Sequence, residues 1–121
     1  MKKSEFRAEL MKIMPGYSWT IHNTRNPAHT LIATGTQSSG SNRLSTLQVE
    51  RRDNYAASGH PLYEVKSAGY GKRAPWLHVE TGRSLAKALR NLQDHYEVMA
   101  RKYAVHLGDM QRGRRAPGDY L

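Results

Sequence analysis

The chain has 121 residues, a mass of 13.7 kDa and a formal net charge of +9, and it contains no cysteine. A chain of this length forms one ordinary domain, and the missing thiols exclude a disulfide framework, a thiolate metal site and a cysteine nucleophile. Leu, Ile, Val and Phe together number only 20, which predicts a thin core that depends on large aromatic side chains.

The first element that the sequence predicts is an amphipathic helix over residues 4–14. Ser4 is the expected N-cap, and Pro15-Gly16 ends the helix. The charged residues of this segment exclude a signal peptide, and the chain lacks the long apolar run of a membrane span. We therefore expect a soluble, cytoplasmic protein. The apolar positions on one helical face are Phe6, Leu10, Ile13 and Met14.

The middle of the chain predicts antiparallel strands. Apolar and polar residues alternate there with period two, and clusters of Gly, Pro, Ser and Asn separate the runs. Residues 38–42 form a five-residue hairpin loop in this interpretation, and residues 69–75 form a basic, Gly-rich loop. The five candidate strands span residues 17–22, 29–37, 43–52, 62–68 and 76–80.

A long helix is predicted over residues 84–107, about 36 Å at 1.5 Å per residue. Thr81 or Ser84 caps its start, and Gly108 is the expected C-cap. Residues 109–121 then predict a flexible basic tail, which leaves residues 1–108 as the folded domain. The helical stripe comprises Leu85, Ala88, Leu89, Leu92, Tyr96, Met99, Tyr103 and Leu107.

These elements together predict an α+β fold. An N-terminal helix precedes an antiparallel sheet of three to five strands, and the long C-terminal helix packs on one face of that sheet. The other sheet face is then wet and carries Thr, Ser, Arg and Lys. The overhanging end of the long helix is a candidate surface for a homodimer.

The positive charge predicts a polyanionic partner, and nucleic acid is the first choice. Residues 66–107 carry eight basic and three acidic side chains. The leading hypothesis is a small, non-enzymatic DNA- or RNA-binding protein, in which cations neutralise phosphates and an aromatic ring stacks on a base. The candidate binding residues are Arg43, Arg51, Arg52, Lys66, Tyr70, Lys72, Arg73, Trp76, Arg83, Arg112, Arg114 and Arg115.

A second hypothesis uses the same basic surface for a protein partner. In this interpretation the chain is a small inhibitor or adaptor, of the phage or mobile-element type, which binds a larger nucleic-acid-handling complex. Size and charge do not separate this function from the first.

A third hypothesis rests on Asp53 followed by Glu64-Val65-Lys66. This arrangement resembles the PD-(D/E)xK pattern of metal-dependent nucleases. The resemblance implies that Asp53 and Glu64 hold Mg²⁺ and that Lys66 assists the attacking water. No Pro precedes Asp53, and no apolar strand begins at it, so the pattern is incomplete.

Metal and cofactor chemistry is otherwise not indicated. The six His residues show no pair at metal-ligand spacing, and we expect scattered surface or interface positions for them. The expectation is therefore a protein without a bound metal or cofactor, and more simply a binding protein than an enzyme.

Overall fold

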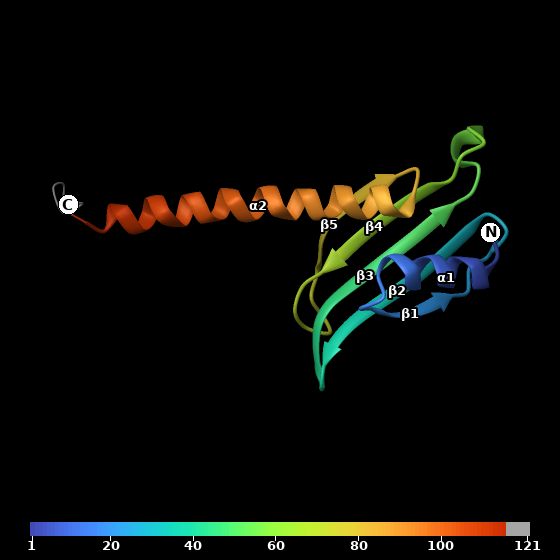
Figure 1. Cartoon of the computed structure of the whole chain (residues 1–121), viewed down its shortest axis with the longest axis horizontal. Coiled ribbons are helices and arrows are strands. Elements are labelled where there is room, and N and C mark those ends of the chain that lie inside the picture. Colours follow the sequence, from blue (N-terminus) through green and yellow to red (C-terminus); the bar gives the residue numbers. More distant parts are fainter. Residues whose placement is uncertain (116–121) are drawn as a thin grey trace.

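The computed structural model describes residues 1–115, which form two helices and one sheet (Figure 1). The α+β architecture predicted from the sequence is confirmed. Helix α1 precedes the sheet, a short 3₁₀ turn η1 lies between β3 and β4, and helix α2 follows the sheet. The elements are α1 (Lys3–Ile13), β1 (Ser18–His22), β2 (Thr30–Ser39), β3 (Asn42–Arg52), η1 (Tyr55–Ala57), β4 (Leu62–Ala68), β5 (Trp76–Gly82) and α2 (Leu85–Gly113).

The sheet is an antiparallel meander whose strand order equals the chain order, β1-β2-β3-β4-β5. The predicted five-residue loop between β2 and β3 is shorter in the structure, because the strands continue to Ser39 and resume at Asn42. Gly40 turns the chain with a φ of +59°, a conformation that costs glycine little. Register shifts after Gln37 of β2 and after Ser67 of β4 leave Leu44 of β3 and Leu77 of β5 unpaired, as in a β-bulge.

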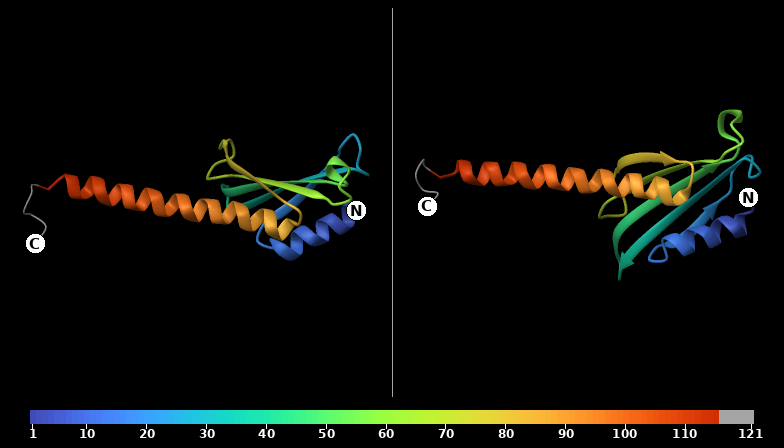
Figure 2. Two further views of the ribbon diagram at one scale, coloured as in Figure 1. Left: turned by 90° about the horizontal axis from the view of Figure 1, so that it is seen from above. Right: turned by 45° about the horizontal axis from the view of Figure 1, so that its top comes forward.

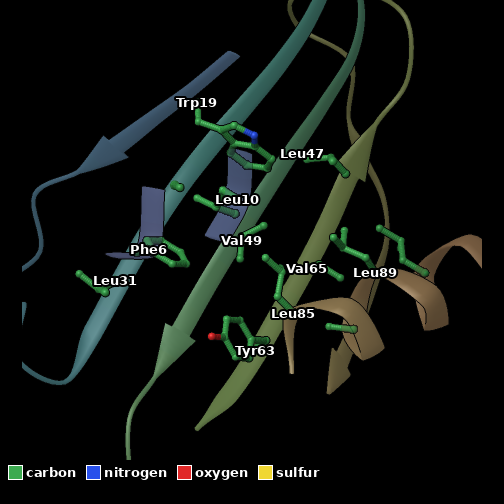
Figure 3. Packing of buried hydrophobic residues seen from close by; sticks show 13 residues of the cluster. Phe6, Leu10, Trp19, Leu31, Leu47, Val49, Tyr63, Val65, Leu85 and Leu89 are labelled. Carbon is green, nitrogen blue, oxygen red and sulfur yellow. The ribbon is translucent and has the colours of Figure 1, made fainter. Parts of the chain in front are cut away.

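Both helices pack on one face of the sheet, as Figure 2 shows. From α1, Phe6 and Leu10 are fully buried, and the first half of α2 contributes the second layer of the core. The prediction that the long helix covers one sheet face is thus confirmed, and α1 covers the neighbouring part of the same face. Figure 3 shows the side chains that meet there: Phe6, Leu10, Trp19, Leu31, Leu47, Val49, Tyr63, Val65, Leu85 and Leu89.

Two glycines allow the closest approaches in this core. A Cβ added to Gly35 would lie 2.8 Å from the ring of Trp19, and one added to Gly82 would lie 2.7 Å from the backbone nitrogen of Ala88. The ring of Trp19 is fixed from its other side, because its Nε1 donates to the carbonyl of Met14 at 3.1 Å. Glycine at these positions therefore lets the ring of Trp19 lie against β2 and lets the start of α2 approach β5.

Helix α1 and the end of α2 differ from the sequence prediction. Helix α1 starts one residue earlier, so Ser4 lies within it, and Glu5 accepts a hydrogen bond from the backbone of Lys2 at 3.1 Å. The start of α2 is correct, because Ser84 accepts from the backbone nitrogen of Lys87 at 3.1 Å.

The predicted end of α2 at residue 107 is wrong, because the helix continues through Gly108 to Gly113. A single glycine costs a helix about 1 kcal/mol, and the i, i+3 ion pair of Asp109 with Arg112 supports the last turn. Residues 109–113 are therefore helical, and residues 116–121 of the predicted tail lie outside the described residues. Within residues 1–115, neither helix has the combination of length and apolar character that crossing a membrane requires.

Strand β5 turns two polar side chains toward α2. His78 pairs in register with Ser67, and Glu80 pairs with Val65, so both face the helices. Val79 pairs with Lys66 on the opposite face, whereas Leu77 is unpaired at the register shift and lines a cavity with α2. Both side chains are exposed. At β5 the sheet face without helices therefore carries the apolar Val79 and the polar Thr81.

Candidate nucleic-acid interface

The loop between β4 and β5 is held against the start of β3. The backbone nitrogen of Gly71 donates to the carbonyl of Arg43 at 2.9 Å, and the hydroxyl of Tyr70 donates to Oδ1 of Asn42 at 3.0 Å. Gly71 has a φ of +109°, which an L side chain rarely adopts. These contacts place the loop beside the β2–β3 hairpin at one end of the sheet.

This loop presents two aromatic rings and several cations to solvent. Tyr70 is 68% exposed and Trp76 is 44% exposed, and both Lys72 and Arg73 between them are exposed. The ammonium group of Lys66 lies 4.6 Å from the centre of the Trp76 ring, a cation–π distance. We call these residues, with Arg43, the hairpin-end surface: Arg43, Lys66, Tyr70, Lys72, Arg73 and Trp76.

The hairpin-end surface carries positive charge without nearby negative charge in its own segment of the chain. The segment from Val65 to Val79 contains three cations and no Asp or Glu. Arg43 contributes from β3, and its Nε is buried without a hydrogen-bond partner in the described part of the chain. A surface of this composition attracts phosphates and offers flat rings for stacking.

The open face of the sheet near β3 and β4 is balanced in charge. Glu50 stands opposite Glu64 in the register. Nη2 of Arg52 lies 2.5 Å from Oε2 of Glu50 and 3.4 Å from Oε2 of Glu64. The guanidinium of Arg52 also lies 5.8 Å from the ring centre of Tyr55. Arg52 is thus already engaged by two carboxylates, which compete with any phosphate for it.

The residues of the nuclease hypothesis do not all come together. Glu64 and Lys66 share the open face and line a hollow of about 180 Å³, as their spacing predicts. Asp53 instead accepts from Arg51 at 2.9 Å, on the side of the helices. The carboxylate beside Glu64 is that of Glu50, which a correct hairpin register for β3 and β4 would have identified.

A metal site is not formed by these carboxylates. In residues 1–115, no group of three or more His, Asp or Glu side chains is placed to hold a metal ion. The guanidinium of Arg52 occupies the position between Glu50 and Glu64 where a cation would be bound. The open face therefore offers an ion pair where the pattern resemblance implies Mg²⁺.

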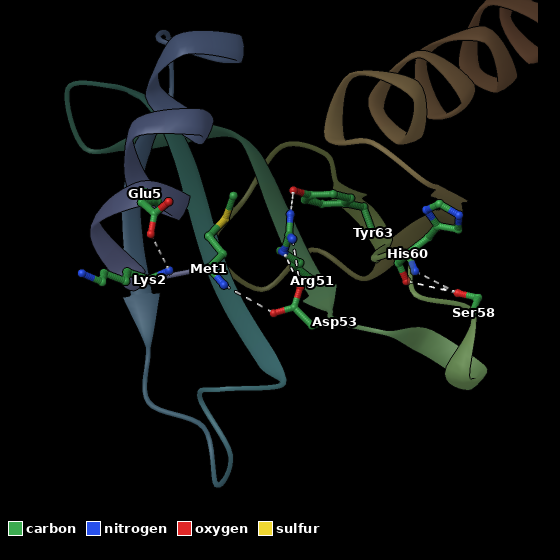
Figure 4. A network of polar contacts seen from close by, with 8 residues as sticks. All are labelled: Met1, Lys2, Glu5, Arg51, Asp53, Ser58, His60 and Tyr63. Atoms are coloured by element: carbon green, nitrogen blue, oxygen red, sulfur yellow. Dashed lines mark hydrogen bonds and ion pairs between the residues drawn. The ribbon is translucent and has the colours of Figure 1, made fainter.

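Arg51 points to the helix-covered face, opposite to Arg52. It donates to Asp53 and to the hydroxyl of Tyr63, and the N-terminal amine lies 3.6 Å from Asp53 (Figure 4). Burial opposes the charge of Arg51, but the contacts with Tyr63 and Asp53 outweigh it and raise its pKa. Burial, reinforced by the carboxylate of Glu9, raises the pKa of Tyr63 to about 12. Arg51 thus fixes one end of the sheet from inside.

Arg83 lies at the end of β5 that is far from the hairpin-end surface. It lines a cavity of about 330 Å³ together with Lys12, Arg51, Glu9 and the first turn of α2. This second basic region differs from the first because Glu9 and Tyr63 share the cavity and no exposed aromatic ring lines it. The structure therefore separates Arg51, Arg52 and Arg83 from the residues of the β4–β5 loop.

The three arginines of the predicted tail lie at the far end of α2. Arg112 belongs to the last helical turn and pairs with Asp109, while Arg114 and Arg115 directly follow the helix. Figures 1 and 2 show that α2 leaves the sheet on the side of the β4–β5 loop and projects well beyond it. These cations therefore lie at the projecting end of α2, away from the sheet.

A cluster that the sequence did not predict joins β5 to α2. The rings of His78 and His95 are stacked with their centroids 3.4 Å apart, and Nε2 of His78 lies 2.5 Å from Glu80. Tyr96 bonds Ser67 through its hydroxyl at 2.5 Å. The sequence places His78 in an alternating strand and Tyr96 in the helical stripe, but it does not show that they are neighbours. They come together because Ser67 pairs with His78 in the register and bonds Tyr96.

Comparison with protein-family models found no matching family, and neither curated proteins nor solved structures gave a match.

Proposed function

We propose that the protein binds nucleic acid through the hairpin-end surface. The observation that carries this proposal is the pair of exposed rings, Tyr70 and Trp76, on either side of the exposed cations Lys72 and Arg73. Such cations neutralise phosphates, and the rings on either side of them stack on bases. The absence of cysteine is compatible with a reducing, cytoplasmic setting.

The exposed rings favour single-stranded over double-stranded nucleic acid. Bases in a duplex are already stacked on their neighbours, whereas unpaired bases have free faces for Tyr70 and Trp76. Lys66 already contacts the Trp76 ring, so it would lie beside the phosphate that flanks a base stacked there. Such contacts carry little sequence information, and we therefore expect weak sequence preference.

The first test is the affinity for labelled single- and double-stranded DNA and RNA at several salt concentrations. One phosphate neutralised by each of Lys66, Lys72 and Arg73 predicts a slope of about −2 for log K against log[salt] with single strands. A slope near zero would remove the proposal, because phosphate contacts must release counterions.

The second test assigns the contact to this surface. The double variant Lys72→Ala/Arg73→Ala is expected to weaken binding about tenfold or more and to flatten the salt slope, and Tyr70→Ala to cost about 1–3 kcal/mol. The matched control is Lys87→Ala/Arg90→Ala, which removes two exposed cations from α2. Equal losses in both double variants would mean that the overall charge, and not this surface, binds the ligand.

The alternative partner is a larger protein with an acidic or nucleic-acid-binding groove. The apolar side chains of Leu77 and Val79, exposed beside the hairpin-end surface, favour this second candidate. A partner that stays bound after nuclease treatment, together with no affinity for free oligonucleotides, would support the inhibitor or adaptor function.

The nuclease is the least favoured function, because Arg52 is bound to both carboxylates of the open face. Any Mg²⁺-dependent cleavage that persists in Glu64→Ala or Lys66→Ala would separate that activity from this protein's own residues.

A further inference from the structure

The second half of α2 carries an apolar face that the rest of the described chain does not cover. From residue 100 to residue 107 every position is exposed, although Tyr103 and Leu107 continue the stripe that packs on the sheet. Met99, Tyr103, His106 and Met110 follow one another at steps of four, three and four residues, the spacing of a coiled-coil seam. We call residues 97–113 the overhang.

A cavity lies where the overhang begins. It measures about 280 Å³ and is lined by Leu77 of β5 and by His95, Tyr96, Met99 and Tyr103 of α2. Its walls are mostly apolar, and it opens on the same side as the seam because Met99 and Tyr103 belong to both. The seam therefore has a hollow at its start and the long apolar side chain of Met110 near its end.

We propose that the overhang pairs with the overhang of a second copy of this chain, antiparallel, with Met110 of each copy in the cavity of the other. In this register Met99 lies opposite Met110 of the second copy, and Tyr103 lies opposite His106. The pairing is self-complementary, as a two-fold dimer requires.

The length of the overhang fits this register. Placing Met99 opposite Met110 puts Tyr96 opposite Gly113, the last helical residue. Tyr96 is also the residue that bonds β4 through Ser67, so the helix of one copy ends where the body of the other begins. A longer helix would meet the sheet, and a shorter one would leave the cavity empty.

Charge favours the antiparallel over the parallel arrangement. Lys102 flanks the seam beside Asp109 of the second copy when the helices are antiparallel, and such flanking charges set helix orientation. In a parallel pair Lys102 would lie beside Leu107, and each His106 would face another His106. Arg101 and Arg112 lie off the seam, where they stay in water beside Glu97 and Asp109 of their own helix.

The overhang is short, so we expect a weak dimer with a dissociation constant of order micromolar. Sedimentation of the full chain over a wide concentration range is expected to show a shift from the 13.7 kDa chain mass to twice that mass. A monomer at every concentration would overturn the proposal and leave this face to a different protein.

The seam is tested by Met110→Glu with Val105→Glu as its matched control. Both side chains are apolar and exposed, at 60% and 64%, on the same part of α2, but Val105 lies off the seam. We expect Met110→Glu to raise the dissociation constant about tenfold or more and Val105→Glu to change it less than about twofold. Equal effects of the two variants on the dissociation constant would overturn the assignment of the dimer contact to the seam.

The orientation is tested with cysteine, which the chain lacks. A chain carrying Met99→Cys is mixed with a tagged chain carrying Met110→Cys. The mixture is oxidised, and the products are separated by mass. The antiparallel register predicts the mixed disulfide as the main product. Disulfides between identical chains in equal or greater amount would overturn it in favour of a parallel pair.

Discussion

The two halves of α2 carry the same apolar stripe in two different environments. In the first half Leu85, Leu89 and Leu92 are buried against the sheet, whereas in the overhang Tyr103, Leu107 and Met110 lie in solvent. The helix is continuous through both. The comparison teaches that periodicity predicts which residues share a face, while the sheet, which ends near Tyr96, decides which of them are covered.

Truncating one leucine in each half gives the largest expected contrast. Leu89 is 4% exposed and Leu107 is 55% exposed. Leu89→Ala is expected to lower the free energy of unfolding by about 2–5 kcal/mol, because it leaves a cavity in the core. Leu107→Ala is expected to stay within about 0.5 kcal/mol. Urea unfolding at low protein concentration measures both, and a similar loss in the two variants would contradict the division of α2.

Adding a methyl group to a glycine in each region gives opposite signs. Gly82→Ala is expected to destabilise the body by about 1–3 kcal/mol, since its Cβ would meet the backbone of α2 at 2.7 Å. Gly108→Ala has only the end of the Arg112 side chain near it, at 3.4 Å. It should stabilise the overhang by about 1 kcal/mol.

Two measurements separate these effects. Thermal unfolding reports the loss in Gly82→Ala, and hydrogen exchange of the overhang amides should slow about fivefold in Gly108→Ala, the equivalent of about 1 kcal/mol. Unchanged thermal stability in Gly82→Ala would mean that β5 and α2 can move apart.

The last expected contrast concerns two tyrosines. The raised pKa of Tyr63, about 12 against an ordinary 10.0, means that the folded state holds this proton more tightly than the unfolded chain. The free energy of unfolding is therefore expected to fall as the pH rises from 10 to 12. Tyr63→Phe should remove that part of the pH dependence, while Tyr103→Phe, in the overhang, should keep it. Urea unfolding across this range decides, and identical profiles for the two variants would contradict the assignment.

The sequence predicted the fold well because periodicity and turn residues are local signals. The strand over residues 62–68 was predicted to the residue, and the start of α2 followed from Ser84. The end of α2 was missed because glycine commonly ends a helix, and the sequence makes Gly108 the expected C-cap. One glycine does not stop a helix whose last turn is supported by an ion pair.

The candidate site was harder to predict because it depends on strand register and on faces. Arg51 and Arg52 are neighbours in the chain, but they lie on opposite faces of β3, and only Arg52 reaches the carboxylates of Glu50 and Glu64. The β4–β5 loop could be recognised from its composition. That its Tyr70 is bonded to Asn42 on β3 could not, because the contact joins segments 28 residues apart.

The meander order of the sheet has a consequence for how the chain folds. Each strand pairs with the one synthesised just before it, so the sheet needs no crossover connection. Chains with such local contacts fold faster than other β-rich proteins. The helices then close the core from both ends of the chain: α1 is already present when β1 and β2 form, whereas Leu85 and Leu89 arrive last. Until they do, the inner side of β4 and β5 is open, and the body of the protein is complete only after the first half of α2 has docked.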